Sequence, residues 1–514
     1  MSPLLLAAGI FSAQSGTATF SEEVRNAVAS GNSSKILELF QNKDDARYLF
    51  EMADRTGGFG RFKAAVIPSP PGWTGTGPFW VVIHQYQGPE SDHDPVYTTI
   101  QRSAGDLKLG PEIAEDASPQ RVSLLTADVH LRPLDDSADF DATVEIEASK
   151  ARQAAIFRLN DIYTVTGPGK VVNANDTLPT PKEGDLVRVG SLLIPWTKGA
   201  VQSYHIKYST QYNLIARGLV DLKAAQDADR LDPKACYITA HWDPSLGQNP
   251  HPTRVRIVGP GSWVLRSEGV AVPADDPLFG KPVQAGAGEQ VAAFKCDVPI
   301  SFPKVIGGDY RLSAEPTEDG TTFRFFQLDP VDGVKGTEIV QKMASALKDY
   351  KKWLGPFPFP TYEAFQGYGY DGMESYSYTV ISPRAFQYAS HELGHTYFGG
   401  IVPCTYIHDT WNEGVTQYID SVVHLKNADK TLEGGLRTLN INRPLTQINV
   451  PWSFGSASYF RGAYVMKMLE AEIGQDNVLD GLKLMVSERR GKETRWDDIR
   501  KYMEATSKDP LDWF

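Results

Sequence analysis

The alternation of hydrophobic and polar positions divides the chain into parts of different texture. Residues 20–55 place apolar side chains at helical spacing, and residues 59–103 change to short β-type runs separated by Pro- and Gly-containing turns. From 118 to 330 almost every run is of strand type, as in Val144–Ala148, where apolar and acidic residues alternate. Similar runs recur at 186–194, 201–209, 253–258 and 321–327. An antiparallel β-sandwich-like domain is therefore expected.

From residue 334 the spacing of apolar residues becomes helical. One face of a predicted helix is marked by Ile339, Met343, Leu347, Tyr350 and Leu354. Gly355-Pro356 then ends this helix and opens a segment rich in proline and aromatic residues. The last part of the chain is therefore expected to be mainly helical.

Together the textures predict an α+β multidomain fold. The expected divisions are a possible signal peptide over 1–16, a small N-terminal α+β extension over 17–117, a β-rich domain over 118–330 and a helical domain over 331–514. The length of 514 residues is sufficient for several domains, and no internal repeat or low-complexity segment interrupts them.

Composition places the chain among globular proteins, with 41% hydrophobic and 22% charged residues. The formal net charge of −12 disfavours nucleic acid and anionic membranes as partners. No apolar run approaches the length of a transmembrane helix. Oligomeric state is left open by these quantities.

The N-terminus carries a short apolar core, Leu4–Phe11, which ends in small residues suited to a signal-peptidase cut. The first basic residue is Arg25, so the positive segment that normally precedes such a core is missing. The pattern favours export to the periplasm or out of the cell, with a frayed terminus of a cytoplasmic protein as the alternative.

Residues 391–395 read His-Glu-Leu-Gly-His, a pattern with metal-binding chemistry. On a helix, the imidazoles of His391 and His395 project from one face about a turn apart. Start and stop signals at Ser382, Pro383 and Gly399-Gly400 predict a helix of about four turns around the motif. The alternative is a surface helix with solvated histidines.

A second motif, Trp411-Asn412-Glu413-Gly414, argues against that alternative. Two imidazoles and the Glu413 carboxylate can fill three positions of a tetrahedral zinc site and leave the fourth for water. Glu392, next to the first histidine, can take a proton from that water. One Zn²⁺ per chain is therefore predicted. The second motif opens a helical pattern whose apolar face consists of Val415, Tyr418, Ile419 and Val422.

The cysteines are too few for a disulfide scaffold. Cys236 and Cys296 could pair in an oxidising compartment, which the sequence leaves open. Cys404 lies between the two zinc motifs, but a buried structural thiol is favoured there over a metal ligand.

The order of a β domain, a Gly-Met-Glu segment, His-Glu-x-x-His, Asn-Glu-Gly and Tyr-x-Arg-Gly resembles the M1 family of zinc aminopeptidases (gluzincins), as a divergent bacterial-type member. The resemblance covers roughly 118–514 and is most specific over 335–514. It implies a thermolysin-like catalytic domain after the β domain. It matches His391, His395 and Glu413 to the zinc ligands and Glu392 to the general base.

The resemblance also implies how substrate is held. Gly372, Met373 and Glu374 match the family segment whose glutamate binds the free α-amine of the substrate. An ammonium held by a fixed carboxylate limits cleavage to the first peptide bond. Tyr459 in Tyr-Phe-Arg-Gly matches the family tyrosine, whose phenol would stabilise the anionic tetrahedral intermediate.

Several features depart from the family pattern. The connection between the two zinc motifs is one residue shorter, and the connection from Glu374 to His391 is also short. Asp371 and Ser375 replace a family Gly and Asn, and the family's upstream substrate-binding Gln cannot be placed. The family usually continues with further helices beyond the segment that this C-terminus resembles. His408-Asp409 lies where a partner for a ligand histidine could sit, with a surface turn as the alternative.

The predicted function is a zinc-dependent aminopeptidase that acts on peptides with a free N-terminus by metal-activated water. The changes at Asp371 and Ser375 leave a related zinc endopeptidase as an alternative. The missing Gln leaves a second one, a catalytically impaired zinc-binding homologue that acts as a binding protein. Its weakness is that Glu392 and Tyr459 have no use in a purely structural site.

Overall fold

The computed structural model describes most of the chain from residue 17 onward, in segments. They are residues 17–46, 49–50, 53, 59, 62–68, 79–85, 96–110, 120–148, 154–160, 163–166, 170–172, 189–195, 201–212, 230–239, 242–245, 250–301, 303–331, 334–367, 372–383, 385–404, 410–437, 445–447, 457–508 and 510–511. The predicted signal peptide, Asp371 and His408-Asp409 lie outside the described residues.

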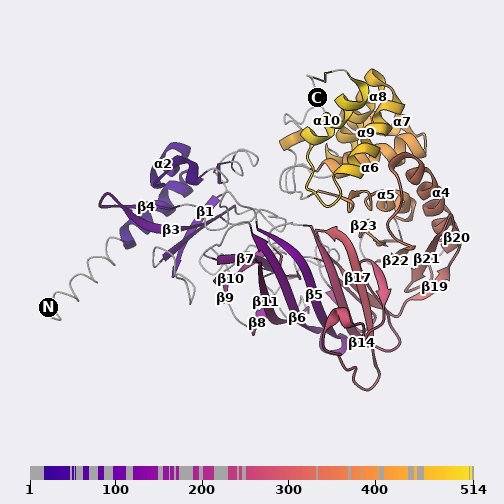
Figure 1. Ribbon diagram of the computed structural model, residues 1–514, viewed down its shortest axis with the longest axis horizontal. Helices are drawn as coiled ribbons and strands as arrows, with labels where there is room; N and C mark the ends of the chain where they lie inside the picture. Colours follow the sequence, from indigo (N-terminus) through magenta and orange to yellow (C-terminus); the bar gives the residue numbers. More distant parts are fainter. Residues whose placement is uncertain are drawn as a thin grey trace.

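The first described part packs helices against a small sheet (Figure 1). Residues 17–29 are helical, and Asn32 begins α2 (Ser33–Leu39) because its side chain accepts a hydrogen bond from the Lys35 amide at 3.1 Å. The sheet has the order β1-β2-β3-β4. Its strands are β1 (Phe62–Pro68), β2 (Phe79–Gln85), β3 (Val96–Ser103) and β4 (Asp106–Leu109). The predicted change from helical to β texture is found here.

The central part consists of two sheets around one core. The larger has the order β16-β17-β14-β5-β6-β11-β8, and the smaller has the order β12-β13-β18-β15. The strands of the larger sheet are β5 (Gln120–Arg132), β6 (Ser137–Ala148), β8 (Thr164–Val165), β11 (Val201–Gln211), β14 (His251–Pro260), β16 (Val270–Val272) and β17 (Glu289–Ile300). Those of the smaller sheet are β12 (Arg230–Leu231), β13 (Ala235–Ile238), β15 (Val264–Ser267) and β18 (Val305–Gly308). A further sheet, of order β7-β10-β9, contains β7 (Ala154–Asn160), β9 (Lys170–Val172) and β10 (Val189–Pro195).

The pattern along β6 explains why the sandwich closes. Phe140, Val144 and Ile146 are buried, and the alternating acidic side chains between them are partly exposed. Apolar side chains of both sheets meet in a single cluster, among them Val144, Ile257 and Leu265. The predicted antiparallel, sandwich-like arrangement has one exception in the larger sheet, since β5 and β14 run parallel. These two strands are far apart in sequence, and local patterns of hydrophobic and polar residues do not reveal which distant strands pair.

The third part begins with a mixed sheet of order β19-β21-β22-β24-β23, with β20 paired to β21. Its strands are β19 (Arg311–Ala314), β20 (Thr317–Glu318), β21 (Thr321–Gln327), β22 (Thr361–Gln366), β23 (Gly372–Glu374) and β24 (Tyr378–Ile381). Helix α4 (Gly336–Leu354) connects the parallel strands β21 and β22 and buries the predicted apolar face. The boundary predicted at 330 therefore cuts through a sheet, because the run at 321–327 pairs with strands that follow it.

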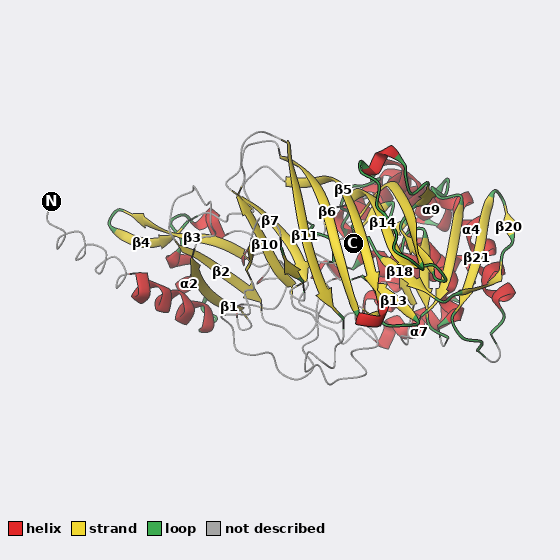
Figure 2. Cartoon of the chain, turned by 90° about the horizontal axis from the view of Figure 1, so that it is seen from below, coloured by secondary structure: helices red, strands yellow, loops and turns green. Residues whose placement is uncertain are grey.

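The remaining helices gather at the C-terminal end of the molecule (Figure 1), and Figure 2 shows them behind the strands of the central and third parts. They are α5 (Ala389–Gly394), α6 (Trp411–Gln417), the π-helix η8 (Tyr418–His424), α7 (Ala428–Arg437), the π-helix η10 (Ala457–Arg461), α8 (Gly462–Ile473), α9 (Gln475–Glu488) and α10 (Trp496–Ser507), with the short strands β25 (Phe398–Gly399) and β26 (Val402–Pro403) between α5 and α6. One apolar core joins them to α4. None of the helices in the described segments is long and apolar enough to span a membrane.

The helix predicted around the His-Glu-Leu-Gly-His motif is shorter than expected. The regular α-helix α5 has six residues and follows a 3-10 turn at Phe386–Tyr388. Beyond it, the amide of Gly400 bonds to the carbonyl of His395 at 2.9 Å, and Gly399 adopts a φ of 122° that lets the chain enter β25. Ser382 does not cap a helix; its carbonyl accepts from the Ala385 amide in a turn at 3.0 Å.

All three cysteines are buried, and none of them forms a disulfide. Cys236 lies on β13 and Cys296 on β17, in different sheets of the sandwich, and the disulfide that the sequence left open is not formed. The Cys296 thiol bonds to the Val298 carbonyl at 3.3 Å, and burial raises the pKa of that thiol. These thiols serve as packing groups.

Candidate metal centre

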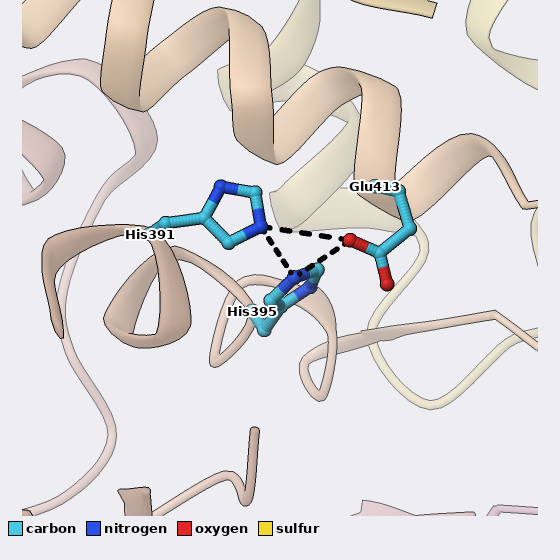
Figure 3. A group of neighbouring side chains, drawn as sticks. All are labelled: His391, His395 and Glu413. Atoms are coloured by element: carbon cyan, nitrogen blue, oxygen red, sulfur yellow. Dashed lines mark hydrogen bonds and ion pairs between the residues drawn. The ribbon is translucent and has the colours of Figure 1, made fainter. Parts of the chain in front are cut away.

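Three side chains from two helical segments converge in the third part of the chain (Figure 3). Nε2 of His391 and Nε2 of His395 are 3.1 Å apart. Oε2 of Glu413 lies 3.5 Å from the first nitrogen and 3.2 Å from the second. All three side chains are buried, and they form the one such group of potential metal ligands among the described residues.

The triangle fits a tetrahedral zinc ion. Bond lengths of zinc to imidazole and carboxylate, combined with tetrahedral angles, place ligand atoms about 3.3 Å from one another. The separations of 3.1, 3.2 and 3.5 Å in this chain bracket that value. Two imidazole nitrogens with one carboxylate oxygen are a donor set of catalytic zinc sites, which leave one position open.

Hydrogen bonding orients one of the two imidazoles. Nδ1 of His395 donates to the carbonyl of Phe398 at 3.0 Å, so the lone pair of Nε2 faces the other ligand atoms. The turn after α5, which shortened the predicted helix, supplies this carbonyl. Nδ1 of His391 is buried and has no hydrogen-bond partner among the described residues.

The charges of the triangle favour a cation. Burial alone would raise the pKa of Glu413, but the neighbouring imidazoles of His395 and His391 hold that pKa well below its usual value. Burial opposes protonation of His395, and the Glu413 carboxylate overcomes that effect and raises the pKa of this imidazole. A buried carboxylate that remains ionised beside two imidazoles is matched to a divalent ion.

Glu392 is held close to the triangle by α5. Its side chain is 7% exposed, and burial raises its pKa to about 7. Glu374 and Glu413 raise this pKa further, whereas the two imidazoles lower it. A carboxylate with a pKa near neutrality is suited to accept a proton and then return it.

The segment Gly372–Glu374 forms β23, the edge strand of the third part's sheet. Gly372 faces the Glu392 carboxylate so closely that a Cβ at position 372 would collide with Oε1. Glu374 is near enough to the same group to raise the pKa of Glu392. Met373 points outward and is 39% exposed. The structure thus brings Gly372 and Glu374 to the triangle but leaves the Met373 side chain away from it.

Tyr459 approaches from the opposite segment, on the π-helix η10. Its ring centroid lies 5.7 Å from that of His391. Burial, followed by the nearby carboxylates of Glu413, Glu392 and Glu374, raises the pKa of Tyr459. The phenol therefore keeps its proton at neutral pH and can act as a hydrogen-bond donor. A π-turn is a frequent device for directing a side chain into a functional site.

The third part of the chain matches a known family. Residues 338–514 fit the family model of the peptidase family M1 domain. Residues 338–514 are therefore assigned as a peptidase family M1 domain, called the M1 domain below. The triangle of His391, His395 and Glu413 lies entirely within it.

Curated relatives and solved structures agree with this M1 domain. Aminopeptidase A of Gloydius brevicauda is 27% identical over 163 residues, covering 28% of this chain and 16% of the relative. Aminopeptidase M1 of Arabidopsis thaliana is 22% identical over 244 residues, covering 40% of this chain and 28% of the relative. The matched segment thus spans less than a third of either relative.

The fold is similar to that of solved M1 enzymes. An M1 zinc metallopeptidase from Deinococcus radiodurans superposes with a TM-score of 0.58 at 16% identity, covering 77% of this chain and 92% of that chain. A mutant of it bound to a Tyr-Ser-Ala substrate superposes with a TM-score of 0.55 at 16% identity, covering 75% and 91%. The mixed α/β multidomain fold is thereby established as similar to that of M1 metallopeptidases.

Within the M1 domain, two glycines bring Glu413 and Tyr459 together. Gly414 follows Glu413 on α6, and Gly462 begins α8 directly after the π-helix of Tyr459. A Cβ at Gly414 would lie 2.6 Å from the Cα of Gly462, so the two helix backbones touch. Thr410 and Ser458, whose hydroxyls are 2.6 Å apart, hold the same crossing. The glycines of both sequence motifs therefore serve helix packing.

We expect Gly414→Ala to lower stability by about 1–3 kcal/mol, because the added methyl group must push apart two backbones that cannot yield locally. Activity should fall as well, since Glu413 and Tyr459 lie on the two helices that separate. Thermal unfolding and hydrolysis assays measure the two effects.

Gly481→Ala on α9 is the matched control, since its methyl group would meet the flexible Met503 side chain at 3.0 Å and the Tyr502 carbonyl only at 3.2 Å, against 2.6 Å to backbone at Gly414. A Gly481→Ala protein should stay within about 1 kcal/mol of the native stability. If both variants unfold alike, close approach at Gly414 is not the cause.

A second support of the triangle, Tyr350, was not predicted from the sequence. It was assigned to the apolar face of α4, but its hydroxyl donates to the Ser390 carbonyl and to Asp420, each at 3.2 Å. One phenol thus links the segment of the two histidines with the helix that continues from Glu413. A tyrosine in an apolar stripe gives little signal of such a bond. Asp420 is the stronger signal, because an acidic residue among the buried side chains of Ile419, Val422 and Val423 requires a partner.

Proposed function

We propose that this chain is a zinc-dependent aminopeptidase that removes N-terminal residues from peptides and binds one zinc ion. The observation that carries the proposal is the triangle of His391, His395 and Glu413, whose separations match those of tetrahedral zinc ligands. The names of the curated relatives, an aminopeptidase A and an aminopeptidase M1, support the reaction class.

When bound, zinc supplies a Lewis acid that polarises the scissile carbonyl and makes water acidic enough to attack at neutral pH. Glu392 takes the proton from the attacking water and passes it to the leaving amine. The phenol of Tyr459 donates to the oxygen that becomes negative in the tetrahedral intermediate. The division of roles follows from chemistry and position, because Glu392 adjoins the first histidine and carries a carboxylate with a raised pKa, whereas Tyr459 brings a protonated phenol from another helix to within 5.7 Å of that imidazole ring.

The Glu374 carboxylate binds the ammonium group of the substrate. It ends an edge strand whose first residue, Gly372, lies against the general base. An ammonium anchored there places the first peptide bond of the substrate near the triangle, because Glu374 is close enough to Glu392 to raise the pKa of that group. Solved M1 metallopeptidases recorded with L-tryptophan, L-arginine and a Tyr-Ser-Ala substrate support ligands with a free α-amine.

The test pairs zinc stoichiometry with hydrolysis of a panel of aminoacyl anilides, and then compares free with N-acetylated peptides. We expect about one zinc ion per chain and hydrolysis of substrates with a free amine only. Glu374→Ala should reduce kcat/KM for those substrates by roughly 10²-fold, because a buried ammonium loses its charged partner. Equal rates on free and acetylated peptides would favour the endopeptidase alternative, and zinc without hydrolysis would favour a binding protein.

A further inference from the structure

Two charged side chains of the central sandwich reach into the M1 domain beside Glu374. Glu268 lies in the turn between β15 and β16, and Lys304 directly precedes β18. They are 1% and 5% exposed, respectively. Charged residues so deeply buried are retained only where they are paired and hydrogen-bonded. Both of them contact the same short segment, the turn of residues 374–378 between β23 and β24, which we call the anchor turn.

The contacts are made to the backbone of the anchor turn. Oε2 of Glu268 accepts hydrogen bonds from the amides of Tyr376 and Ser377 at 3.1 and 3.2 Å, and from the Ser377 hydroxyl at 3.1 Å. The ammonium of Lys304 donates to the carbonyl of Glu374 and lies 5.9 Å from the Tyr376 ring centroid. Three backbone groups of the turn, the Glu374 carbonyl and the amides of Tyr376 and Ser377, are thus satisfied by residues 70 to 109 positions away in sequence.

The M1 domain holds the anchor turn at the Tyr376 carbonyl, which accepts from the Thr396 hydroxyl at 2.9 Å, whereas the Glu374 carbonyl is held by Lys304. Among the described residues, β23 is an edge strand that pairs only with β24, and its three residues leave Glu374 at the end. Within the turn, the Ser375 amide bonds to the Tyr378 carbonyl at 3.0 Å. The direction of the Glu374 side chain is set by the backbone of this residue, whose carbonyl is the group that Lys304 holds.

A different set of charges already ties the sandwich to the M1 domain. Glu363 on β22 is buried and pairs with Arg266 of β15 and with Arg324 of β21, the latter at 3.0 Å. Glu363 lies opposite Tyr378, where the anchor turn enters β24, but no hydrogen bond or ion pair among the described residues joins this set to Glu374, Tyr376 or Ser377. Both sets are buried charged groups between the sandwich and the M1 domain, but only Glu268 and Lys304 bond to the backbone of the anchor turn. The Glu363 set therefore serves as the control.

We infer that Lys304 and Glu268 are positioning residues, through which the sandwich domain fixes the Glu374 carboxylate for binding of the substrate amine. The inference rests on the proposed function and assigns a catalytic contribution to a part of the chain outside the M1 domain. Lys304 acts on Glu374 through the carbonyl of that residue, and Glu268 fixes the amides of Tyr376 and Ser377 in the anchor turn. Neither residue touches the substrate.

The experiment is a double-mutant cycle of Lys304→Met with Glu374→Ala, measured on aminoacyl anilides. Lys304→Met keeps the length of the side chain and removes its donor, so KM should rise roughly tenfold while kcat changes less than about threefold. In the Glu374→Ala background the same substitution should have no further effect on KM, because the group that Lys304 positions is gone. Zinc content should be unchanged in all four proteins.

Two matched controls separate positioning from general damage. Glu363→Gln weakens the other tie between the domains, and Lys351→Met removes a lysine that also donates to a backbone carbonyl, that of Asp319 at 2.8 Å. Both should keep the native KM. Independent, multiplicative effects of Lys304→Met and Glu374→Ala, or a fall of kcat at constant KM, would overturn the inference.

A milder variant covers the case in which Lys304→Met does not fold. Ser377→Ala removes one donor to Glu268 and the acceptor of the Gly269 amide at 2.8 Å, and it should also raise KM selectively. Calorimetry with L-amino acid amides on the zinc-loaded protein adds a readout without turnover, in which both variants should bind more weakly. If the wild-type protein hydrolyses anilides, and the Lys304→Met and Ser377→Ala proteins bind amino acid amides and turn over anilides normally, the inference is wrong but the proposed function stands. A wild-type protein that neither hydrolyses nor binds contradicts the proposed function and the inference with it.

Discussion

Replacing Glu392 with glutamine is expected to reduce kcat by roughly 10²–10⁴-fold while zinc stays bound, because the amide cannot accept the proton of the attacking water. The side chain keeps its size, and none of the three converging ligand atoms belongs to it. The variant should also fold normally. Burial raises the pKa of Glu392 to about 7, so a neutral amide replaces a carboxylate whose charge is costly at this position. Metal analysis, thermal unfolding and steady-state kinetics on one preparation measure the three effects.

A Glu470→Gln protein is the control for the chemistry of the substitution. Glu470 lies on α8 of the same domain, where it accepts a hydrogen bond from the Tyr418 hydroxyl at 2.8 Å and pairs with Lys467. This change should leave kcat near the native value. Native turnover in the Glu392→Gln protein would show that another group activates water. Loss of zinc from it would mean that Glu392 supports the metal site itself.

The residues of the triangle could be predicted because their types and their spacing within short segments of sequence indicate a metal site. Two histidines four positions apart meet on any helical turn, so the short α5 was sufficient even though the predicted four-turn helix was wrong. The apolar face that follows Glu413 identified its helix in the same way, and Val415, Tyr418 and Ile419 are all buried. The domain boundary could not be predicted in this way. The boundary placed at 330 separates β21 from its partner β22, because the pairing of strands depends on contacts that no local pattern contains.

What surrounds the triangle could not be predicted, since it depends on contacts across long sequence distances. Glu268 and Lys304 carry no motif, and their role appears only when the sandwich is placed against the anchor turn. The glycines of the two motifs were visible in the sequence, but not the contact between them. A pair of residues without side chains has no pattern of polarity or periodicity by which to recognise its partner.

Removal of zinc is expected to abolish hydrolysis and to lower the unfolding temperature of the M1 domain. The three ligands lie on segments separated in sequence, and all are buried, so the ion connects parts of the core. At free zinc 100 to 1,000 times Kd, a ligand that binds only the folded state stabilises it by about 2.7–4.1 kcal/mol. For a unit of this size that corresponds to roughly 5–15 °C. Calorimetry before and after dialysis against a chelator measures the shift, and zinc should restore both quantities.

The role of Glu413 makes this prediction specific to the site. Without its carboxylate, two imidazoles remain, too few to retain zinc against a chelator, so a Glu413→Ala protein should have no activity and no zinc-dependent shift in unfolding temperature. Magnesium should not replace zinc in the native protein, because two of the three ligands are imidazole nitrogens and magnesium prefers oxygen. A zinc-dependent shift that persists in Glu413→Ala would place the stabilising ion elsewhere in the chain. The geometry of the triangle would then describe a hydrogen-bonded cluster of buried side chains, and the case for a hydrolase would lose its main support.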